Sequence, residues 1–372
     1  MRAIPVVLLS LACATEPKPQ DAPEAPMADT TSPSDALVST DTDTDTDTDT
    51  DADADTDTDV PTPTGDTGTI TTGGTTSTGG TTVETVPVRF VALGDAGEGN
   101  DAQYTVSEAI EAVCAVRGCD FALYLGDNFY DSGVDDVYDT QFITKFEDPY
   151  ANLTLPFYVV LGNHDLGLDG LGVKFWKGPI YVDYEQFSYK WTMPDVFYSF
   201  EVENVKFYGL NTTDIFFGFG ADQEAWIADE FIARSPEIEW NIGFGHHPYV
   251  SNGQHGNAGN YEGIPDAIPY SEIPRGQYIK EFFDAGACGN LDVYFSGHDH
   301  NRQWVGEECG TEFVVSGAGA KTTDLEGRGN FTLFEDDTKE GFAWIEIDGN
   351  TLTGAFYDLD GVEEFSTTIT KP

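Results

Sequence analysis

Basic residues are scarce in this 372-residue sequence. Lysine and arginine number 17 against 66 aspartates and glutamates, which gives a formal net charge of −49. Nucleic acid phosphates repel such a chain, because it has no basic stripe to release their counterions, and docking onto anionic lipid is disfavoured as well. The composition therefore argues against nucleic acid as a partner. Small phosphate-bearing or neutral ligands stay open, provided that a local positive centre such as a metal attracts them.

Cysteine is also rare, and none of the five cysteines forms a C-x-x-C pair. A zinc site made of cysteines is therefore not expected. Four of them, Cys114, Cys119, Cys288 and Cys309, predict two disulfides in an exported protein. The local pairing of 114 with 119 and 288 with 309 is the simplest, but the sequence allows three pairings.

The N-terminus has no apolar run long enough to span a bilayer permanently. Residues 1–13, MRAIPVVLLSLAC, join a basic second residue to a short apolar stretch, which is typical of a signal peptide. The SLAC at its end resembles a bacterial lipobox, whose cysteine, here Cys13, is acylated after cleavage. An ordinary secretory signal is the alternative. We therefore expect export, either as a bacterial outer-membrane or cell-surface lipoprotein anchored through Cys13 or as a secreted or periplasmic protein.

Residues 14–85 have few apolar side chains and contain the repeat DTDTDTDTDTDADADTDTD. Such a segment cannot offset the entropy of ordering, so it predicts a disordered acidic linker that lifts a domain off a membrane. The composition of a folded protein begins at Val86, and residues 86–372 are predicted to form one domain.

Short apolar runs that end at glycine recur through this domain. VRFVALGD, FALYLGD, PFYVVLGNHD, WNIGFGHH and VYFSGHDH predict buried strands. Amphipathic stretches at 104–118, 221–235 and 275–287 predict helices, and 196–212 and 341–359 predict hairpins. The alternation favours an α/β fold with two packed mixed β-sheets and helices outside.

Residues that bind metals follow each of the five predicted strands. They are Asp95; Asp127 and Tyr130; Asn163 and His164; His246 and His247; and His298 and His300. Open α/β sheets bind ligands at the carboxyl ends of their strands, and carboxylate, phenolate, amide and imidazole groups suit iron, manganese and zinc. The set is too large for one ion, so it predicts a pair of metals that share a carboxylate, an arrangement used for phosphoester displacement.

The order GD…GDxxY…GNH…GH…GHxH resembles that of the calcineurin-like metallophosphoesterases, and among them the purple acid phosphatases of the small tartrate-resistant type. The stretches RFVALGD, LGDNFYDSGV, FYVVLGNHD, GHHPYVSNGQHG and GHDHN carry the resemblance across residues 86–372. It implies a four-layer sandwich and a centre of Fe(III) plus a divalent iron, zinc or manganese. Many relatives in the wider superfamily have a histidine two residues after the first aspartate. Here that residue is Gly97, and Tyr130 takes its place as a ligand that favours iron(III).

The resemblance also implies a role for each matching residue. Asp95, Asp127, Tyr130 and His300 match the iron(III) ligands, with Asp127 bridging. Asn163, His246 and His298, again with Asp127, match the divalent site. His164 and His255 match two catalytic histidines that are not ligands and face the substrate phosphate.

The implied reaction is phosphomonoester hydrolysis, in which a metal-bound hydroxide attacks phosphorus and a histidine protonates the leaving oxygen. The choice between His164 and His255 as the donor of that proton stays open. A phosphodiesterase or nucleotide phosphatase on the same site is the first alternative, and a non-enzymatic surface-anchored binding protein is the second. Ala96 replaces the usual tryptophan, which leaves the substrate range open. His247 is expected to be a loop residue, and Lys321 to have a surface role.

Overall fold

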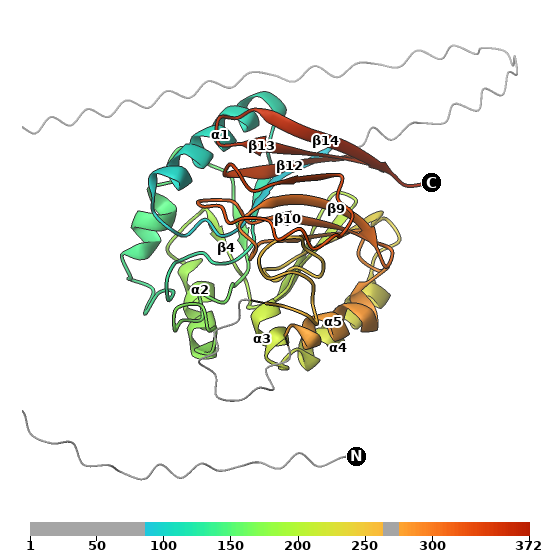
Figure 1. The fold of residues 1–372 in the computed structure, drawn as a ribbon, viewed down its shortest axis with the longest axis horizontal. Coiled ribbons are helices and arrows are strands. Elements are labelled where there is room, and N and C mark those ends of the chain that lie inside the picture. The colour runs from blue at the N-terminus through green and yellow to red at the C-terminus, as the bar shows by residue number, and fades with distance from the viewer. Residues whose placement is uncertain (1–85, 263–274) are drawn as a thin grey trace, which may run out of the picture. The chain divides into compact units, whose positions relative to one another are not determined.

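The computed structural model describes residues 86–262 and 275–372. The segments predicted as a signal peptide (1–13) and as an acidic linker (14–85) lie outside these residues. Within the described residues, the strands form two seven-stranded mixed sheets (Figure 1).

The first sheet brings the N-terminal strands of the domain beside a C-terminal meander. Its order is β14 (Glu363–Thr370), β13 (Thr351–Asp358), β12 (Gly341–Asp348), β1 (Val88–Leu93), β2 (Phe121–Tyr124), β3 (Phe157–Val159) and β4 (Trp191–Thr192). Strands β1 to β4 run parallel, and β12, β13 and β14 are antiparallel to their neighbours.

The second sheet has a parallel centre as well. Its order is β11 (Phe334–Asp336), β9 (Arg302–Glu308), β10 (Thr311–Ser316), β8 (Val293–Ser296), β7 (Trp240–Phe244), β6 (Val205–Gly209) and β5 (Tyr198–Val202). Strands β6, β7, β8 and β10 run parallel, so the carboxyl ends of β7 and β8 lie side by side.

Aromatic side chains join the two sheets face to face. Phe90 of β1 lies 5.4 Å from Phe207 of β6 and 5.8 Å from Phe295 of β8, between ring centroids. A strand that is covered on both faces needs apolar side chains throughout, which is why the central strands appear as unbroken apolar runs in the sequence.

Helices cover the outer faces of both sheets. The helices are α1 (Asp101–Arg117), α2 (Gly178–Tyr184), α3 (Thr212–Phe216), α4 (Ala221–Ala233) and α5 (Gln277–Phe282), with a 3₁₀ turn at Phe175–Lys177 and π-helical turns at Ile143–Glu147 and Phe283–Ala287. The side chain of Asn100 caps α1, and Gly118 ends it at a φ of 83°. Helix α1 packs on the first sheet, while Phe216, Ile227 and Phe282 from α3, α4 and α5 pack on the second. The four-layer sandwich with helices outside is therefore confirmed.

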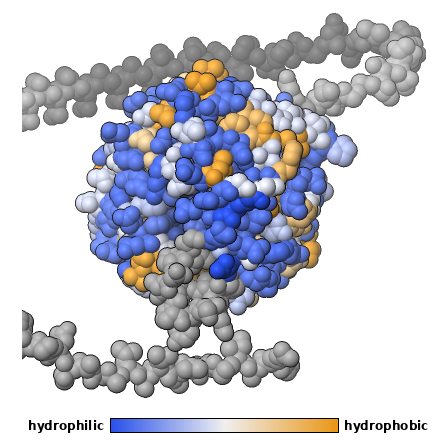
Figure 2. All heavy atoms as spheres, viewed as in Figure 1, coloured by the Kyte–Doolittle hydropathy of each residue, from blue (hydrophilic) through white to orange (hydrophobic). Residues whose placement is uncertain are grey.

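Both predicted local disulfides form, Cys114–Cys119 and Cys288–Cys309. Within the described ranges, no helix combines the length and apolar character that a membrane span requires. One face of the molecule is mostly hydrophilic, with separate small hydrophobic patches, as the charge of the sequence predicts (Figure 2).

Candidate metal centre

Two aspartates follow neighbouring parallel strands of the first sheet. Asp95 follows β1 and Asp127 follows β2, with side chains that are 0% and 1% exposed. Both have a positive φ, 57° and 51°, in the sharp turn that ends the strand. The Asp95 amide donates to the Gly126 carbonyl, which holds the two turns together. Two carboxylates are thus buried side by side, an arrangement that requires a compensating cation.

The Tyr130 hydroxyl lies between these carboxylates. Its oxygen is 2.9 Å from Asp95 Oδ1, 2.9 Å from Asp127 Oδ2 and 3.2 Å from His300 Nε2. Burial raises the pKa of Tyr130 well above its usual value, and the negative charges of Asp127 and Asp95 raise it further. The phenol is therefore protonated in the metal-free chain, and a metal would have to displace its proton.

Gly97 explains why no histidine can occupy the position two residues after Asp95. A Cβ atom there would lie 2.2 Å from the carbonyl carbon and oxygen of Asn128. The Tyr130 amide also donates to the Gly97 carbonyl. The loop that carries Tyr130 therefore fills the space that a side chain at position 97 would need.

The second sheet contributes the histidines. His246 follows β7, and His298 and His300 follow β8. His246 Nδ1 is 2.9 Å from the Leu125 carbonyl, which only accepts hydrogen bonds, so Nδ1 donates and Nε2 faces the site. That Nε2 lies 3.1 Å from His298 Nδ1.

Asn163 joins this group from the turn after β3. Its Nδ2 donates to the Gly170 carbonyl, so its Oδ1 faces His246 Nε2 at 2.9 Å. All seven predicted ligands therefore lie at one end of the two sheets: Asp95, Asp127, Tyr130, Asn163, His246, His298 and His300.

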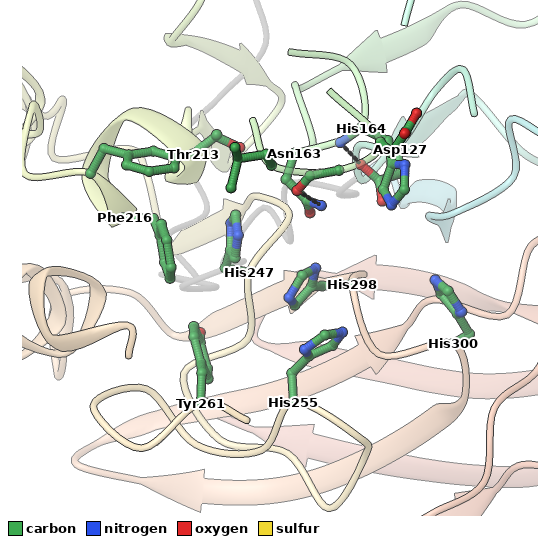
Figure 3. A pocket seen from close by; sticks show the side chains of 14 residues that line it. Asp127, Asn163, His164, Thr213, Phe216, His247, His255, Tyr261, His298 and His300 are labelled. Atoms are coloured by element: carbon green, nitrogen blue, oxygen red, sulfur yellow. Dashed lines mark hydrogen bonds between the residues drawn. The ribbon is translucent and has the colours of Figure 1, made fainter. Parts of the chain in front are cut away.

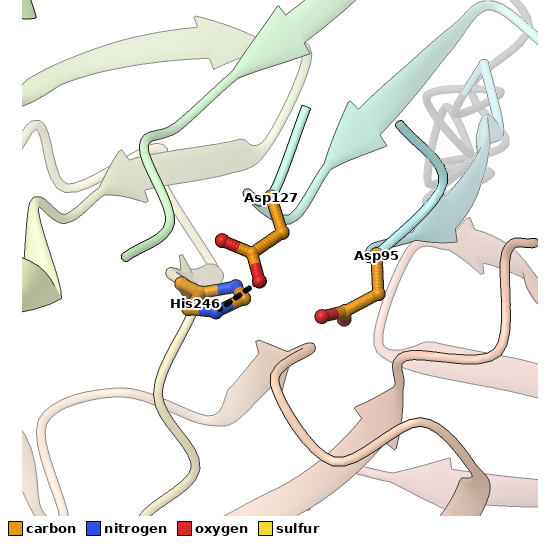
Figure 4. Close-up of side chains that lie close together, drawn as sticks. All are labelled: Asp95, Asp127 and His246. Atoms are coloured by element: carbon orange, nitrogen blue, oxygen red, sulfur yellow. Dashed lines mark ion pairs between the residues drawn. The ribbon is translucent and has the colours of Figure 1, made fainter. Parts of the chain in front are cut away.

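The arrangement fits a metal. Ligand atoms of Asp95, Asp127 and His246 all lie within 4.8 Å of one another (Figure 4). Burial raises the pKa of Asp127, but His246 and His164 outweigh it and hold that pKa well below its usual range. Burial lowers the pKa of His246, but Asp127 and Asp95 raise it to about 9. Without a metal, a protonated imidazole thus supplies the positive charge that the carboxylates require, and a bound metal would replace that proton.

The two predicted non-ligand histidines border a cavity beside this centre. His164 Nδ1 lies 2.7 Å from the Asp131 carbonyl, and His255 Nδ1 lies 2.9 Å from the Glu262 carbonyl. Both rings line the cavity, and His255 stacks on His298 with ring centroids 4.0 Å apart (Figure 3). The Nε2 atom of each ring is not the one engaged by the backbone, so each can serve a ligand in the cavity.

Two buried aspartates that were not among the predicted site residues hold the site together. Asp165 accepts hydrogen bonds from the backbone amides of Asn128, Phe129 and Gly162. It thereby connects the turns that carry Asp127 and Asn163. On the other side, Asp299 Oδ1 accepts from the His255 amide at 2.8 Å, and Asp299 Oδ2 accepts from the Ser251 hydroxyl. Each immediately follows a predicted site histidine, and that position was the available signal.

Two neighbours of the ligands prove to be structural. The Asn128 side-chain nitrogen donates to the Val160 carbonyl and to Asp165, so this nitrogen is committed to the fold. His247 is buried, with Nδ1 2.9 Å from Thr212 Oγ1, and it forms part of the cavity wall. The same threonine oxygen accepts from the amides of both His246 and His247, which fixes the turn after β7.

Lys321 does not have the surface role that we expected. Its Nζ lies 3.3 Å from the centroid of the Tyr130 ring and 2.6 Å from Glu98 Oε1. A cation over an aromatic face is attracted by the electron density of that face. Lys321 therefore acts on a predicted metal ligand from outside the ligand set.

Comparisons with known proteins agree with this architecture. The family model of the calcineurin-like phosphoesterases matches residues 88–302, more than half of the chain, so the protein belongs to that family.

Within it, the chain is homologous to purple acid phosphatases. It is 27% identical to human (Homo sapiens) tartrate-resistant acid phosphatase type 5 over 327 residues, which cover 77% of this chain and 92% of that one. It is 26% identical to purple acid phosphatase 4 of Arabidopsis thaliana over 296 residues, with 74% of this chain and 81% of that one covered.

Solved structures show the same fold. The anchor protein GAP50 of the inner membrane complex of Plasmodium superposes with a TM-score of 0.59 at 20% identity, covering 76% of this chain and 89% of that one. A purple acid phosphatase from yellow lupin (Lupinus luteus) seeds superposes with a TM-score of 0.56 at 16% identity, covering 77% of this chain and 54% of that one.

Proposed function

We propose that this protein is a phosphomonoesterase with two metal ions, Fe(III) and a divalent iron, zinc or manganese. Its family makes it a hydrolase of phosphoric esters. The observation that carries the proposal is the meeting of four oxygen donors, Asp127 among them, and three imidazoles. Asp127 Oδ2 is 2.9 Å from the Tyr130 hydroxyl and 3.4 Å from His246 Nε2, so this carboxylate lies beside residues of both proposed ligand sets.

The protein's own residues divide into two roles. Asp95, Asp127, Tyr130 and His300 would hold Fe(III), and Asp127, Asn163, His246 and His298 would hold the divalent ion. When bound, the pair would neutralise phosphate oxygens and activate water.

His164 and His255 would bind the substrate phosphate, and one of the two would donate a proton to the leaving oxygen. Each has Nδ1 held at a backbone carbonyl, so Nδ1 carries its proton there and Nε2 is the atom that can exchange a proton with a ligand. The backbone contacts fix the orientation of both rings before substrate arrives, which lowers the entropic cost of catalysis.

The test is an optical spectrum of the purified protein, with metal analysis of the same sample. Two metals per chain including iron, with a broad visible band that disappears in Tyr130→Phe, are the expected result. A colourless protein with two zinc or manganese ions would contradict the iron assignment. A metal-loaded protein that hydrolyses no phosphate monoester would contradict the function, and hydrolysis of diesters alone would favour the phosphodiesterase.

We also propose export of the protein, with residues 1–13 as a signal and 14–85 as a linker, in one of two forms: anchored by a lipid at Cys13, or secreted or periplasmic. Two disulfides in the domain support an oxidising compartment. Mass spectrometry of the mature N-terminus decides between the two forms. An acylated Cys13 supports the lipoprotein, and an unmodified N-terminus beyond residue 13 supports a secreted or periplasmic protein.

A further inference from the structure

The cavity beside the metal centre has two chemically different walls. It has a volume of about 180 Å³, smaller than the roughly 300–1,000 Å³ that is common for ligand sites. One wall consists of the proposed ligands and catalytic histidines. The apolar part of the lining consists of Leu171, Phe216, Phe217 and Tyr261. In Figure 3, Phe216 and Tyr261 lie beside His247, at the side away from Asp127 and His300.

The apolar wall is held in place by stacked rings. Phe216 stacks on His247 with centroids 5.3 Å apart, and Tyr261 stacks on Phe216 at 6.3 Å. Phe217 meets Phe175 edge to face at 5.5 Å, and Phe175 meets Phe219 at 5.2 Å. Because Phe219 is 62% exposed, the aromatic surface continues from the cavity to solvent. The wall is thus a preformed apolar surface next to the phosphate position.

Charge in the cavity disfavours a second anionic group on the substrate. None of the described residues that line it is a lysine or an arginine, and Asp169 lies among them. The Ser132 hydroxyl donates to Asp169 Oδ1 at 2.8 Å and accepts from the Asp169 amide at 2.9 Å, which holds this carboxylate at the cavity. An extra phosphate or carboxylate would therefore meet the negative charge of Asp169 with no lysine or arginine among the described lining residues to offset it.

Building on the proposed function, we infer the substrate class: phosphomonoesters of small alcohols that carry an uncharged aromatic or apolar group. The phosphate would bind at the metal centre, and the group would pack against Phe216, Phe217 and Tyr261. Hydrolysis breaks the bond between phosphorus and the alcohol oxygen. Water supplies the hydroxyl to phosphorus and the proton to the alcohol, so no further reactant is needed. Esters with a second anionic group would be poor substrates.

The test compares 2-phenylethyl phosphate with ethyl phosphate on the metal-loaded full-length protein. Both are esters of primary alkyl alcohols, so leaving-group chemistry is matched and the phenyl ring is the difference. We expect kcat/KM to be at least about tenfold higher for the phenyl ester, since apolar pockets distinguish even one methylene by roughly 10–200-fold. The ratio of kcat/KM for the phenyl ester to that for ethyl phosphate should fall several-fold in Phe217→Ala. It should stay as in wild type in Phe331→Ala, because Phe331 is exposed and lies outside the cavity. Leu171→Ala, which also removes an apolar side chain of the lining, replaces Phe217→Ala if that variant does not fold.

A second comparison tests the charge. The ratio of kcat/KM for 2-carboxyethyl phosphate to that for propyl phosphate should be below one and should rise roughly two- to fivefold in Asp169→Asn, as expected for a partly exposed charge. Equal kcat/KM for the ethyl and phenylethyl esters, or a ratio unchanged in the wall variants, would overturn the inference while leaving a phosphomonoesterase. Failure to hydrolyse any of the four esters would overturn the proposed function and the inference with it.

Discussion

The two sheets contribute different chemistry to the same site. The turns after β1, β2 and β3 in the first sheet bring the oxygen donors Asp95, Asp127, Tyr130 and Asn163. The turns after β7 and β8 in the second sheet bring the nitrogen donors His246, His298 and His300. Each proposed metal takes ligands from both sheets, so neither sheet has a complete site. The proposed centre would therefore form only when the two sheets are packed.

The largest expected effect is at Asp127, the one residue assigned to both metals. Asp127→Asn should lower kcat/KM for a phosphomonoester more than about 100-fold, since even the hydrogen-bond partners of ligands are worth roughly 10–100-fold. It should also lose both metals, whereas His298→Ala should lose the divalent ion and keep iron. Asp136→Asn, at an exposed position, is the control. Equal metal loss in Asp127→Asn and His298→Ala would show that Asp127 is not a ligand of both metals.

The disulfides give a second comparison, because each belongs to a different side of the sandwich. Cys114–Cys119 joins the end of α1 to the start of β2, and Cys288–Cys309 joins the segment before β8 to the turn between β9 and β10. Their sequence separations are 5 and 21 residues. Loop entropy predicts a loss of unfolding free energy of about 2 kcal/mol for the first and about 3 kcal/mol for the second.

Double cysteine-to-alanine variants and denaturant unfolding measure this difference. A larger loss from the Cys114–Cys119 pair would show that strain or residual structure, and not loop length, determines their contributions.

The two buried aspartates, Asp165 and Asp299, are expected to affect different steps, metal binding and catalysis. Asp165 holds turns that carry ligands, and Asp299 holds His255, which is not a ligand. Asp165→Asn should weaken metal affinity roughly 10–100-fold. Asp299→Asn should lower kcat/KM with metal content retained. Metal titration and steady-state kinetics on both variants separate the effects, and loss of metal in Asp299→Asn would contradict the division.

The smallest effect is expected at Lys321. In the iron-loaded protein, its charge over the Tyr130 ring stabilises the electrons of the phenolate, so Lys321→Met should move the visible band to longer wavelength. The change should be modest, because cation–π contacts are worth roughly 0.5–2 kcal/mol. Lys371→Met is the matched control, since Lys371 lies 4.6 Å over Trp240 at the start of β7. A band at the same wavelength in both variants would show that Lys321 has no electronic role.

Much of this fold could be predicted from the sequence because the central strands are covered on both sides. Full burial gives unbroken apolar runs, and the sharp turns after them give glycines such as Gly94 and Gly126. Local sequence patterns also predicted the end of helix α1 at Gly118 and the hairpin at 341–359. Helix α5 is shorter than the predicted 275–287, because its C-terminal part, Phe283–Ala287, forms a π-helical turn.

The role of Lys321 could not be predicted, because a charged side chain in a loop has no local pattern that distinguishes solvent from a buried partner. For Asp165 and Asp299 the available signal was their position directly after a predicted site histidine, and that position does not show which amides they accept from. Lys321 and Tyr130 are 191 positions apart in the sequence and meet only through the fold. The apolar lining of the cavity has the same origin, since Leu171, Phe217 and Tyr261 come from three separate segments.

The sequence by itself determined the strands, the order of the site residues and the kind of atoms available to a metal, because these depend on short-range pattern and side-chain chemistry. Only the tertiary structure decided which sheet carries each residue, why position 97 has no room for a side chain and what forms the cavity opposite the site. Those features depend on contacts between segments far apart in the chain, and such contacts exist only after the two sheets pack.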